Sequence, residues 1–167
     1  MESSSIVLQN EQILQKTKRI AFQIYENTFE SNEIFIGGIA GDGFTFAERI
    51  VDHLKKVSDQ DIQLFKISIN KQNPISEPVE LDIADSRLEN AIVILVDDVI
   101  NSGKTMMYAV NRVLSNNQVK LMKVATLVNR THRRYPVLAD FVGLNIATTL
   151  QDNIIVELGD QNKAFLG

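Results

Sequence analysis

Two adjacent carboxylates, Asp97 and Asp98, and the loop Ser102–Thr105 are the residues whose types and spacing most clearly predict chemistry in this chain. The five residues before them, Ile92–Val96, are apolar and mostly β-branched, which predicts a strand buried on both faces. Helical spacing resumes after the loop. Carboxylates at a strand end accept hydrogen bonds from sugar hydroxyls, and backbone N–H groups at a helix N-terminus surround a phosphate. The pattern therefore predicts a site for a ligand that carries both hydroxyls and a phosphate.

Three other interpretations of this run must be weighed. A Walker A loop needs a glycine five residues before Gly103, but that position is Asp98. A phospho-receiver domain also has an acidic pair after a strand, but after its first strand, whereas this pair lies past the middle of the chain. A purely structural interpretation stays open, in which the acidic strand end caps the following helix through Ser102.

The composition limits the class of protein. The 167 residues match the usual size of one domain, and 44% of them are hydrophobic, which is enough to build a core. No apolar stretch could span a membrane and no signal peptide is recognisable, so we expect a cytoplasmic protein without a membrane partner. The lack of cysteine and the presence of two histidines exclude disulfides and argue against a metal site built by the protein itself. The net charge of −4 disfavours broad nucleic-acid binding but allows a local basic patch.

Hydrophobic periodicity predicts an α/β fold: a single domain over residues 1–167, with a mostly parallel sheet and helices on both faces. The irregular segment 70–90 is expected to contain a long loop that acts as a lid. The predicted helices cover residues 11–27, 44–57 and 106–116, and the predicted strands cover residues 34–39, 63–69, 92–96, 123–128, 139–142 and 154–158.

Four loops follow the carboxyl ends of predicted strands: residues 37–43, the region of Asn70, residues 97–105 and residues 129–134. Ligands of parallel sheets bind beyond these strand ends. We therefore expect the four loops to form one site.

The run from Ile92 to Thr105 resembles the phosphoribosyl pyrophosphate (PRPP) motif of type I phosphoribosyltransferases. That motif has a hydrophobic strand, an acidic pair, two apolar residues and a Thr/Ser-Gly-x-Thr loop. The departures are mild, because Ser102 replaces the commoner threonine and Lys104 stands where arginine is frequent.

A second resemblance covers nearly the whole chain. The segment Leu127–Pro136 is similar to the Val-Asp-Arg-Gly-His-Arg-x-x-Pro segment of the PyrR family, which comprises pyrimidine-operon attenuators with uracil phosphoribosyltransferase activity. Residues 139–149 continue the similarity, as do residues 6–8, 19–21 and 38–39. The resemblance implies transfer of phosphoribose from Mg²⁺-bound PRPP to a pyrimidine base, expected to be uracil, in a homodimer or higher oligomer. The alternative that it implies is a nucleotide-sensing regulator that binds an RNA hairpin with little or no catalysis.

The resemblance also assigns roles to residues of this chain. The assigned groups are catalytic Asp97 and Asp98; Ser102, Gly103, Lys104 and Thr105 for the phosphate of PRPP; Ile39, Ala40, Gly41, Asp42 and Gly43 for the pyrophosphate; Arg130, Ile146 and Thr148 for the base; and His132, Arg133 and Arg134 for RNA. Purine enzymes of this type usually carry a second aspartate three residues after the acidic pair, as a base toward the purine ring. Here that residue is Asn101, which takes no proton at neutral pH. Orotate enzymes match the closing segment less well.

The pyrophosphate loop departs from the PyrR pattern Gly-Ile-Lys-Thr-Arg-Gly. Ala40 replaces the lysine and Asp42 replaces the arginine, so two cations that help to hold pyrophosphate are lost. A carboxylate repels a pyrophosphate unless a cation intervenes. Asp42 could bind the Mg²⁺, cap the next helix or mark the loss of anion binding. We expect weak catalysis from this loop.

Overall fold

The structure is a computed structural model, which describes residues 5–149 and 151–167. Its central sheet has six strands in the order β4-β3-β2-β5-β6-β7. Five of them run parallel, and β4 pairs antiparallel with β3. The strands are β2 (Glu33–Ile39), β3 (Asp61–Ser68), β4 (Glu80–Leu81), β5 (Ile92–Ile100), β6 (Leu121–Arg130) and β7 (Phe141–Ile146). The predicted α/β fold with a mostly parallel sheet is confirmed.

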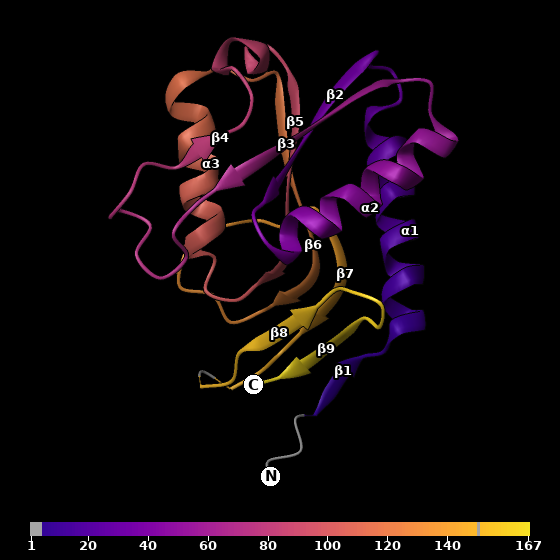
Figure 1. Cartoon of the computed structure of the whole chain (residues 1–167), viewed down its shortest axis with the longest axis vertical. Coiled ribbons are helices and arrows are strands. Elements are labelled where there is room, and N and C mark those ends of the chain that lie inside the picture. Colours follow the sequence, from indigo (N-terminus) through magenta and orange to yellow (C-terminus); the bar gives the residue numbers. More distant parts are fainter. Residues whose placement is uncertain (1–4, 150) are drawn as a thin grey trace.

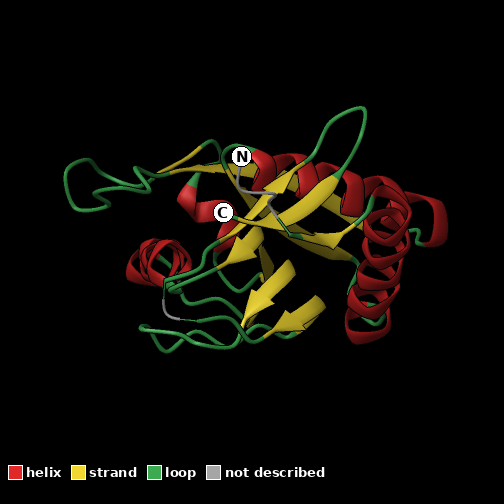
Figure 2. Cartoon of the chain, turned by 90° about the horizontal axis from the view of Figure 1, so that it is seen from below, coloured by secondary structure: helices red, strands yellow, loops and turns green. Residues whose placement is uncertain are grey.

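Helices cover both faces of this sheet (Figures 1 and 2). The helices α1 (Asn10–Thr28) and α2 (Asp42–Val57) lie on one face, and α3 (Lys104–Asn116) and the short 3₁₀ helix η1 (Asp85–Leu88) lie on the other. Among the described residues, no helix combines the length and the apolar character that crossing a membrane requires.

The buried strand β5 separates two hydrophobic cores. Ile92, Ile94 and Val96 pack into the core beneath α1 and α2, whereas Val93 and Leu95 pack into the core beneath α3. Alternate side chains of a strand point to opposite faces, so a strand with helices on both sides needs apolar residues at every position. This double burial explains the unbroken apolar run in the sequence.

A second, antiparallel sheet lies beside the carboxyl ends of the central strands (Figure 1). Its strands are β1 (Ile6–Leu8), β8 (Ile154–Glu157) and β9 (Lys163–Leu166), in the order β1-β9-β8. Arg49 of α2 donates a hydrogen bond to Asn162 Oδ1 at 2.8 Å, and the Asn162 side chain donates to Asn10 Oδ1 at 2.7 Å. These bonds attach the small sheet to the helical layer. Of its three strands, only the one near Ile154 was predicted.

The structure differs from the prediction in two segments next to the site. Strand β5 does not end at Val96 but continues to Ile100, so Asp97 and Asp98 lie inside the strand. Backbone pairing of Asp97 with Thr126 and of Val99 with Val128 on β6 holds this extension. The irregular segment 70–90 contains the short elements β4 and η1, in addition to the predicted loop.

Candidate functional site

The acidic pair is buried at the carboxyl end of β5. The exposed fraction is 3% for Asp97 and 6% for Asp98. Asp97 Oδ1 accepts a hydrogen bond from the Asp98 N–H at 3.0 Å and lies 3.7 Å from Lys71 Nζ. Burial raises the pKa of Asp97, the neighbouring Asp98 raises it further, and the charge of Lys71 partly opposes both. The pair is therefore a strong acceptor site in a poorly solvated position.

The first turn of α2 leaves just enough room for this pair. A Cβ atom at Gly43 would lie 2.4 Å from Asp97 Oδ1, which is closer than real contacts allow. Glycine at this position lets the helix approach the carboxylate directly.

The phosphate loop, Ser102–Thr105, joins β5 to α3. Gly103 adopts a φ of +85° as the residue before the helix, a conformation that glycine adopts without steric cost. The Lys104 N–H donates to Ser102 Oγ at 3.2 Å, and α3 begins at Lys104. The first N–H groups of a helix lack partners within the helix and carry its positive dipole end. The loop therefore presents the kind of backbone that binds phosphate.

A cavity of about 190 Å³ joins Asp97 to the phosphate loop. Lys71, Asp97 and residues 99–106 line it. The predicted phosphate residues and one carboxylate thus share a single cavity, together with a lysine from the loop after β3 that the sequence did not single out.

The basic segment after β6 packs on the phosphate loop. The Arg134 and Tyr135 N–H groups both donate to the Ser102 carbonyl, at 3.1 and 3.0 Å. The Arg133 guanidinium donates to the Val137 carbonyl and to Asn129 Oδ1, and its burial lowers the pKa of Arg133. Three residues were predicted to contact RNA. Of these, His132 and Arg134 are exposed, whereas Arg133 is half-buried in its own loop.

Beside the phosphate loop lies a second cavity, of about 340 Å³, with a basic lining. The residues that line it are Asn101, Ser102, Arg130, His132, Arg133, Arg134 and Asn153. Arg130 is 6% exposed and donates to Asn153 Oδ1 and to the Thr149 carbonyl, both at 3.3 Å. Ile146 pairs with Arg130 across β6 and β7, and Thr148 follows β7, but neither lines the cavity. Of the predicted base-binding residues, only Arg130 reaches this space.

The predicted pyrophosphate loop, Ile39–Gly43, joins β2 to α2. Gly41 precedes the helix with a φ of +96°, and Asp42 is the first helical residue. The backbone of Leu158, next to the small sheet, lowers the pKa of Asp42. Burial raises the pKa of Asp42, and Asp98 raises it further. Asp42 therefore faces the acidic pair and the small sheet. The N-cap position of α2 is occupied by Gly41 and not by Asp42.

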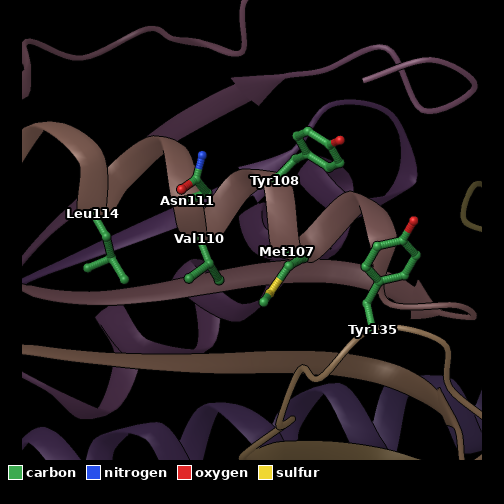
Figure 3. A pocket seen from close by; sticks show the side chains of 6 residues that line it. All are labelled: Met107, Tyr108, Val110, Asn111, Leu114 and Tyr135. Atoms are coloured by element: carbon green, nitrogen blue, oxygen red, sulfur yellow. The ribbon is translucent and has the colours of Figure 1, made fainter. Parts of the chain in front are cut away.

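A larger hollow, of about 450 Å³, lies on the outer surface of α3 (Figure 3). Met107, Val110 and Leu114 project from one side of the helix, and Tyr135 stands across from Met107 (Figure 3). No charged side chain lines this hollow. A phosphorylated ligand fits the cavity of the phosphate loop better, because that cavity has both a lysine and the N-terminal N–H groups of α3.

Two features of the site were not predicted from sequence. Lys71 lies in the predicted lid, and its position in a polar loop carries no signal of its own. Asn101 was weighed only as a missing aspartate, yet its side chain bonds to the backbone of Ile154 in β8. Both contacts join segments that are distant in the sequence.

Comparison with known proteins agrees with this arrangement. The family model described as "Phosphoribosyl transferase domain" matches residues 3–162. The chain is 34% identical to the "Bifunctional protein pyrR" of Enterococcus faecalis, over 87% of this chain and 85% of that protein. It is 29% identical to the "Bifunctional protein PyrR" of Macrococcus caseolyticus, over 96% of this chain and 97% of that protein.

Solved structures show the same fold. A hypoxanthine-guanine phosphoribosyltransferase of Bacillus anthracis superposes with a TM-score of 0.73 at 24% identity, over 92% of this chain and 87% of that chain. The hypoxanthine phosphoribosyltransferase of Trypanosoma cruzi superposes with a TM-score of 0.77 at 18% identity, over 97% of this chain and 95% of that chain. At these identities, the superpositions establish the architecture and not the base. The chain belongs to the type I phosphoribosyltransferase family and has the PyrR proteins among its relatives.

Proposed function

We propose that this protein transfers the phosphoribosyl group of Mg²⁺-bound PRPP to uracil, forming UMP and pyrophosphate. The observation that carries the proposal is the cavity that joins buried Asp97 to the N-terminus of α3. It combines acceptors for ribose hydroxyls with donors for a 5′-phosphate in one cavity. We propose a single domain over residues 1–167, acting in the cytoplasm as a homodimer or higher oligomer.

In the proposed mechanism the substrate is held at both ends. The 5′-phosphate binds the backbone and hydroxyl groups of Ser102–Thr105, and Asp97 and Asp98 accept hydrogen bonds from the ribose hydroxyls. As the bond from C1 to the pyrophosphate oxygen breaks, positive charge develops on the ribose. The two carboxylates favour this charge, because a preformed charge in a poorly solvated site stabilises it without reorganisation. The N1 atom of uracil then bonds to C1, and the proton of N1 passes to water.

Magnesium enters this reaction as part of the substrate. Among the described residues, no three His, Cys, Asp or Glu side chains are grouped as a metal site. We therefore assign most of the ligand positions of Mg²⁺ to the oxygens of PRPP itself. Its charge offsets part of the negative charge of the departing pyrophosphate.

The base is proposed to occupy the basic cavity near Arg130. Uracil has two carbonyl oxygens, and arginine offers donors for such acceptors. Asn101 favours a pyrimidine over a purine, since it lacks the proton-accepting carboxylate that purine enzymes of this type usually have at this position. Its side chain is also committed to Ile154, which leaves it less free to contact a base.

The test is a transferase assay with radiolabelled uracil, orotate and hypoxanthine in separate reactions with Mg²⁺ and PRPP. We expect label in UMP only from uracil, and loss of product in Asp98→Asn. A charged acceptor is about twice as strong a hydrogen-bond partner as a neutral one, so this variant should also bind UMP more weakly. Product from hypoxanthine alone would overturn the choice of base, and no PRPP or UMP binding would overturn the whole proposal.

A second candidate function is nucleotide-dependent RNA binding, in line with the resemblance to PyrR attenuators. The exposed side chains of His132 and Arg134 favour it, because they border the proposed nucleotide site and also face solvent. A bound nucleotide could thus alter the surface that meets RNA.

A further inference from the structure

The proposed pyrophosphate loop carries no cation of its own. Ala40 and Asp42 stand where the PyrR pattern has lysine and arginine, and the charges of Asp98 and Glu157 raise the pKa of Asp42. A pyrophosphate that leaves from this region would therefore meet negative charge on several sides. Mg²⁺ alone does not remove this repulsion, because the pyrophosphate carries three or four negative charges.

Lys71 is placed to correct this imbalance. Its Nζ lies 3.7 Å from Asp97 Oδ1, and 46% of its side chain is exposed. It lines the cavity of the phosphate loop. Its charge lowers the pKa of both Asp97 and Asp42 against the effect of burial. Lys71 therefore lies within electrostatic reach of the acidic pair and of the pyrophosphate loop together.

The loop that carries Lys71 has a defined conformation. Asn70 Oδ1 accepts hydrogen bonds from the N–H groups of Gln72 and Asn73, at 3.1 and 3.0 Å. The Ser76 N–H donates to the Asn73 carbonyl at 3.0 Å. Such turns reduce the conformational freedom of the backbone on both sides of Lys71.

The strand that leads into this loop is bonded to the pyrophosphate loop. The Ala40 N–H donates to the Ile67 carbonyl at 2.9 Å, which joins the ends of β2 and β3. A cavity of about 470 Å³ lies between Ala40, the segment 68–70 and the residues Glu77, Pro78 and Glu80. Ala40 therefore shares a cavity with Asn70, the residue that precedes Lys71.

We infer that Lys71 is the cation that contacts the departing pyrophosphate, in place of the cations missing at positions 40 and 42. The inference rests on the proposed function and names a further catalytic residue for it. Lys71 exchanges Asp97 for the pyrophosphate when Mg²⁺-PRPP binds, keeps its proton, and stabilises the electron pair that leaves with the oxygen. Two neighbouring lysines are less suited, since Lys66 Nζ lies 4.6 Å from the centre of the Phe44 ring and Lys104 belongs to the phosphate loop.

A merely structural role for Lys71 makes a different prediction. If Lys71 only offsets the charge of Asp97, its loss should weaken every ligand that places ribose on the acidic pair. UMP contains the ribose and the 5′-phosphate but no pyrophosphate. Comparing UMP with Mg²⁺-pyrophosphate therefore separates the two roles.

The experiment uses the full chain with Lys71→Ala, Lys71→Arg, Lys71→Ala/Ala40→Lys, and Lys55→Ala as a control at an exposed lysine in the last turn of α2. Calorimetry measures the affinity for Mg²⁺-PRPP, Mg²⁺-pyrophosphate and UMP, and the uracil assay measures kcat. In Lys71→Ala we expect a loss of about 100- to 1,000-fold in kcat, the range for the loss of a single oxyanion donor, together with a loss of pyrophosphate affinity. UMP affinity should fall much less than pyrophosphate affinity. Lys71→Arg and the double variant should recover much of the loss.

Each other result has a distinct meaning. An equal loss of UMP and pyrophosphate affinity would overturn the inference and assign Lys71 to the ribose carboxylates. Full activity of Lys71→Ala in a protein that makes UMP would also overturn it, while leaving the proposed function intact. Failure of wild type to bind PRPP or UMP would instead overturn the proposed function, and the inference with it. If wild type binds PRPP without turnover, the inference is tested by the affinity for Mg²⁺-pyrophosphate alone: an equal affinity in wild type and Lys71→Ala would overturn it.

Discussion

Asn101 exchanges two hydrogen bonds with the backbone of Ile154. Its Nδ2 donates to the Ile154 carbonyl at 3.2 Å, and its Oδ1 accepts from the Ile154 N–H at 3.1 Å. The side-chain amide thus pairs with the first residue of β8 as the backbone of a neighbouring strand would. It joins the loop after β5 to the small sheet. A carboxylate could accept from the N–H but could not donate to the carbonyl.

Loss of this contact should loosen the small sheet. Asn101→Ala removes two hydrogen bonds of about 0.5–1.5 kcal/mol each, so we expect a loss of about 1–3 kcal/mol in the free energy of unfolding. Asn101→Asp should also destabilise, because its carboxylate would face the Ile154 carbonyl oxygen. Urea denaturation measures the first effect, and amide hydrogen exchange at Ile154 localises it. The control is Asn32→Ala, at an exposed position before β2. Equal exchange at Ile154 in both variants would contradict the role of Asn101.

The ionised side chain of Asp97 should lower the free energy of unfolding at neutral pH. Its pKa is raised above the unfolded value by burial and by Asp98. The stabilising contribution of such a group is fully present below the unfolded pKa and is lost as pH rises through the folded pKa. Asp97→Asn should therefore raise the Tm at pH 8 by more than at pH 5, while nucleotide binding falls. A gain of about 1 kcal/mol corresponds to roughly 2–4 °C in a chain of this size.

The control for this prediction has the opposite sign. Asp85 accepts two hydrogen bonds from the Arg112 guanidinium, at 2.8 and 3.2 Å, and this contact lowers the pKa of Asp85. Its contribution is present above the unfolded pKa and is lost as pH falls through the folded pKa. Asp85→Asn should therefore lower the Tm at pH 8. Thermal unfolding from pH 5 to 8 measures both variants, and a Tm difference for Asp97→Asn that does not grow with pH would refute the assignment.

Much of this architecture was predictable because its signals are local. The doubly buried run Ile92–Val96 marked the central strand, and the helical spacing after Thr105 marked α3. The end of β5 was misplaced because two carboxylates look like a strand terminus, whereas pairing with β6 carries the strand to Ile100. The small sheet was missed because β1 and β9 are short and are stabilised by contacts with distant segments. Lys71 was missed for the same reason, since its position next to Asp97 depends on how two loops meet.

Gly43 should tolerate no side chain, although it lies in a helix. Alanine normally stabilises a helix interior by about 1 kcal/mol relative to glycine. Here the added Cβ would lie 2.4 Å from Asp97 Oδ1, so the helix or the carboxylate must move. We expect Gly43→Ala to lose about 1–3 kcal/mol in the free energy of unfolding, as overpacking usually does, and to weaken UMP binding. Gly159→Ala is the matched control, because no atom lies within 4 Å of its added Cβ. Equal stability of the two variants would show that the site accommodates the methyl group.

RNA binding, if it accompanies the nucleotide site, should depend on Arg134 more than on Arg133. Arg134 is exposed, whereas the Arg133 guanidinium is bound to Val137 and Asn129 in its own loop. Each arginine that contacts a phosphate adds about 0.7–0.9 to the steepness of the salt dependence of affinity. Arg134→Ala should therefore reduce this slope by about that amount per protomer. The measurement is fluorescence anisotropy of a labelled pyrimidine-operon leader hairpin between 50 and 200 mM salt, with and without UMP, and Lys55→Ala is the control. A hairpin that binds with no salt dependence, or with the same slope in Arg134→Ala, would leave the transferase as the sole proposed function of this fold.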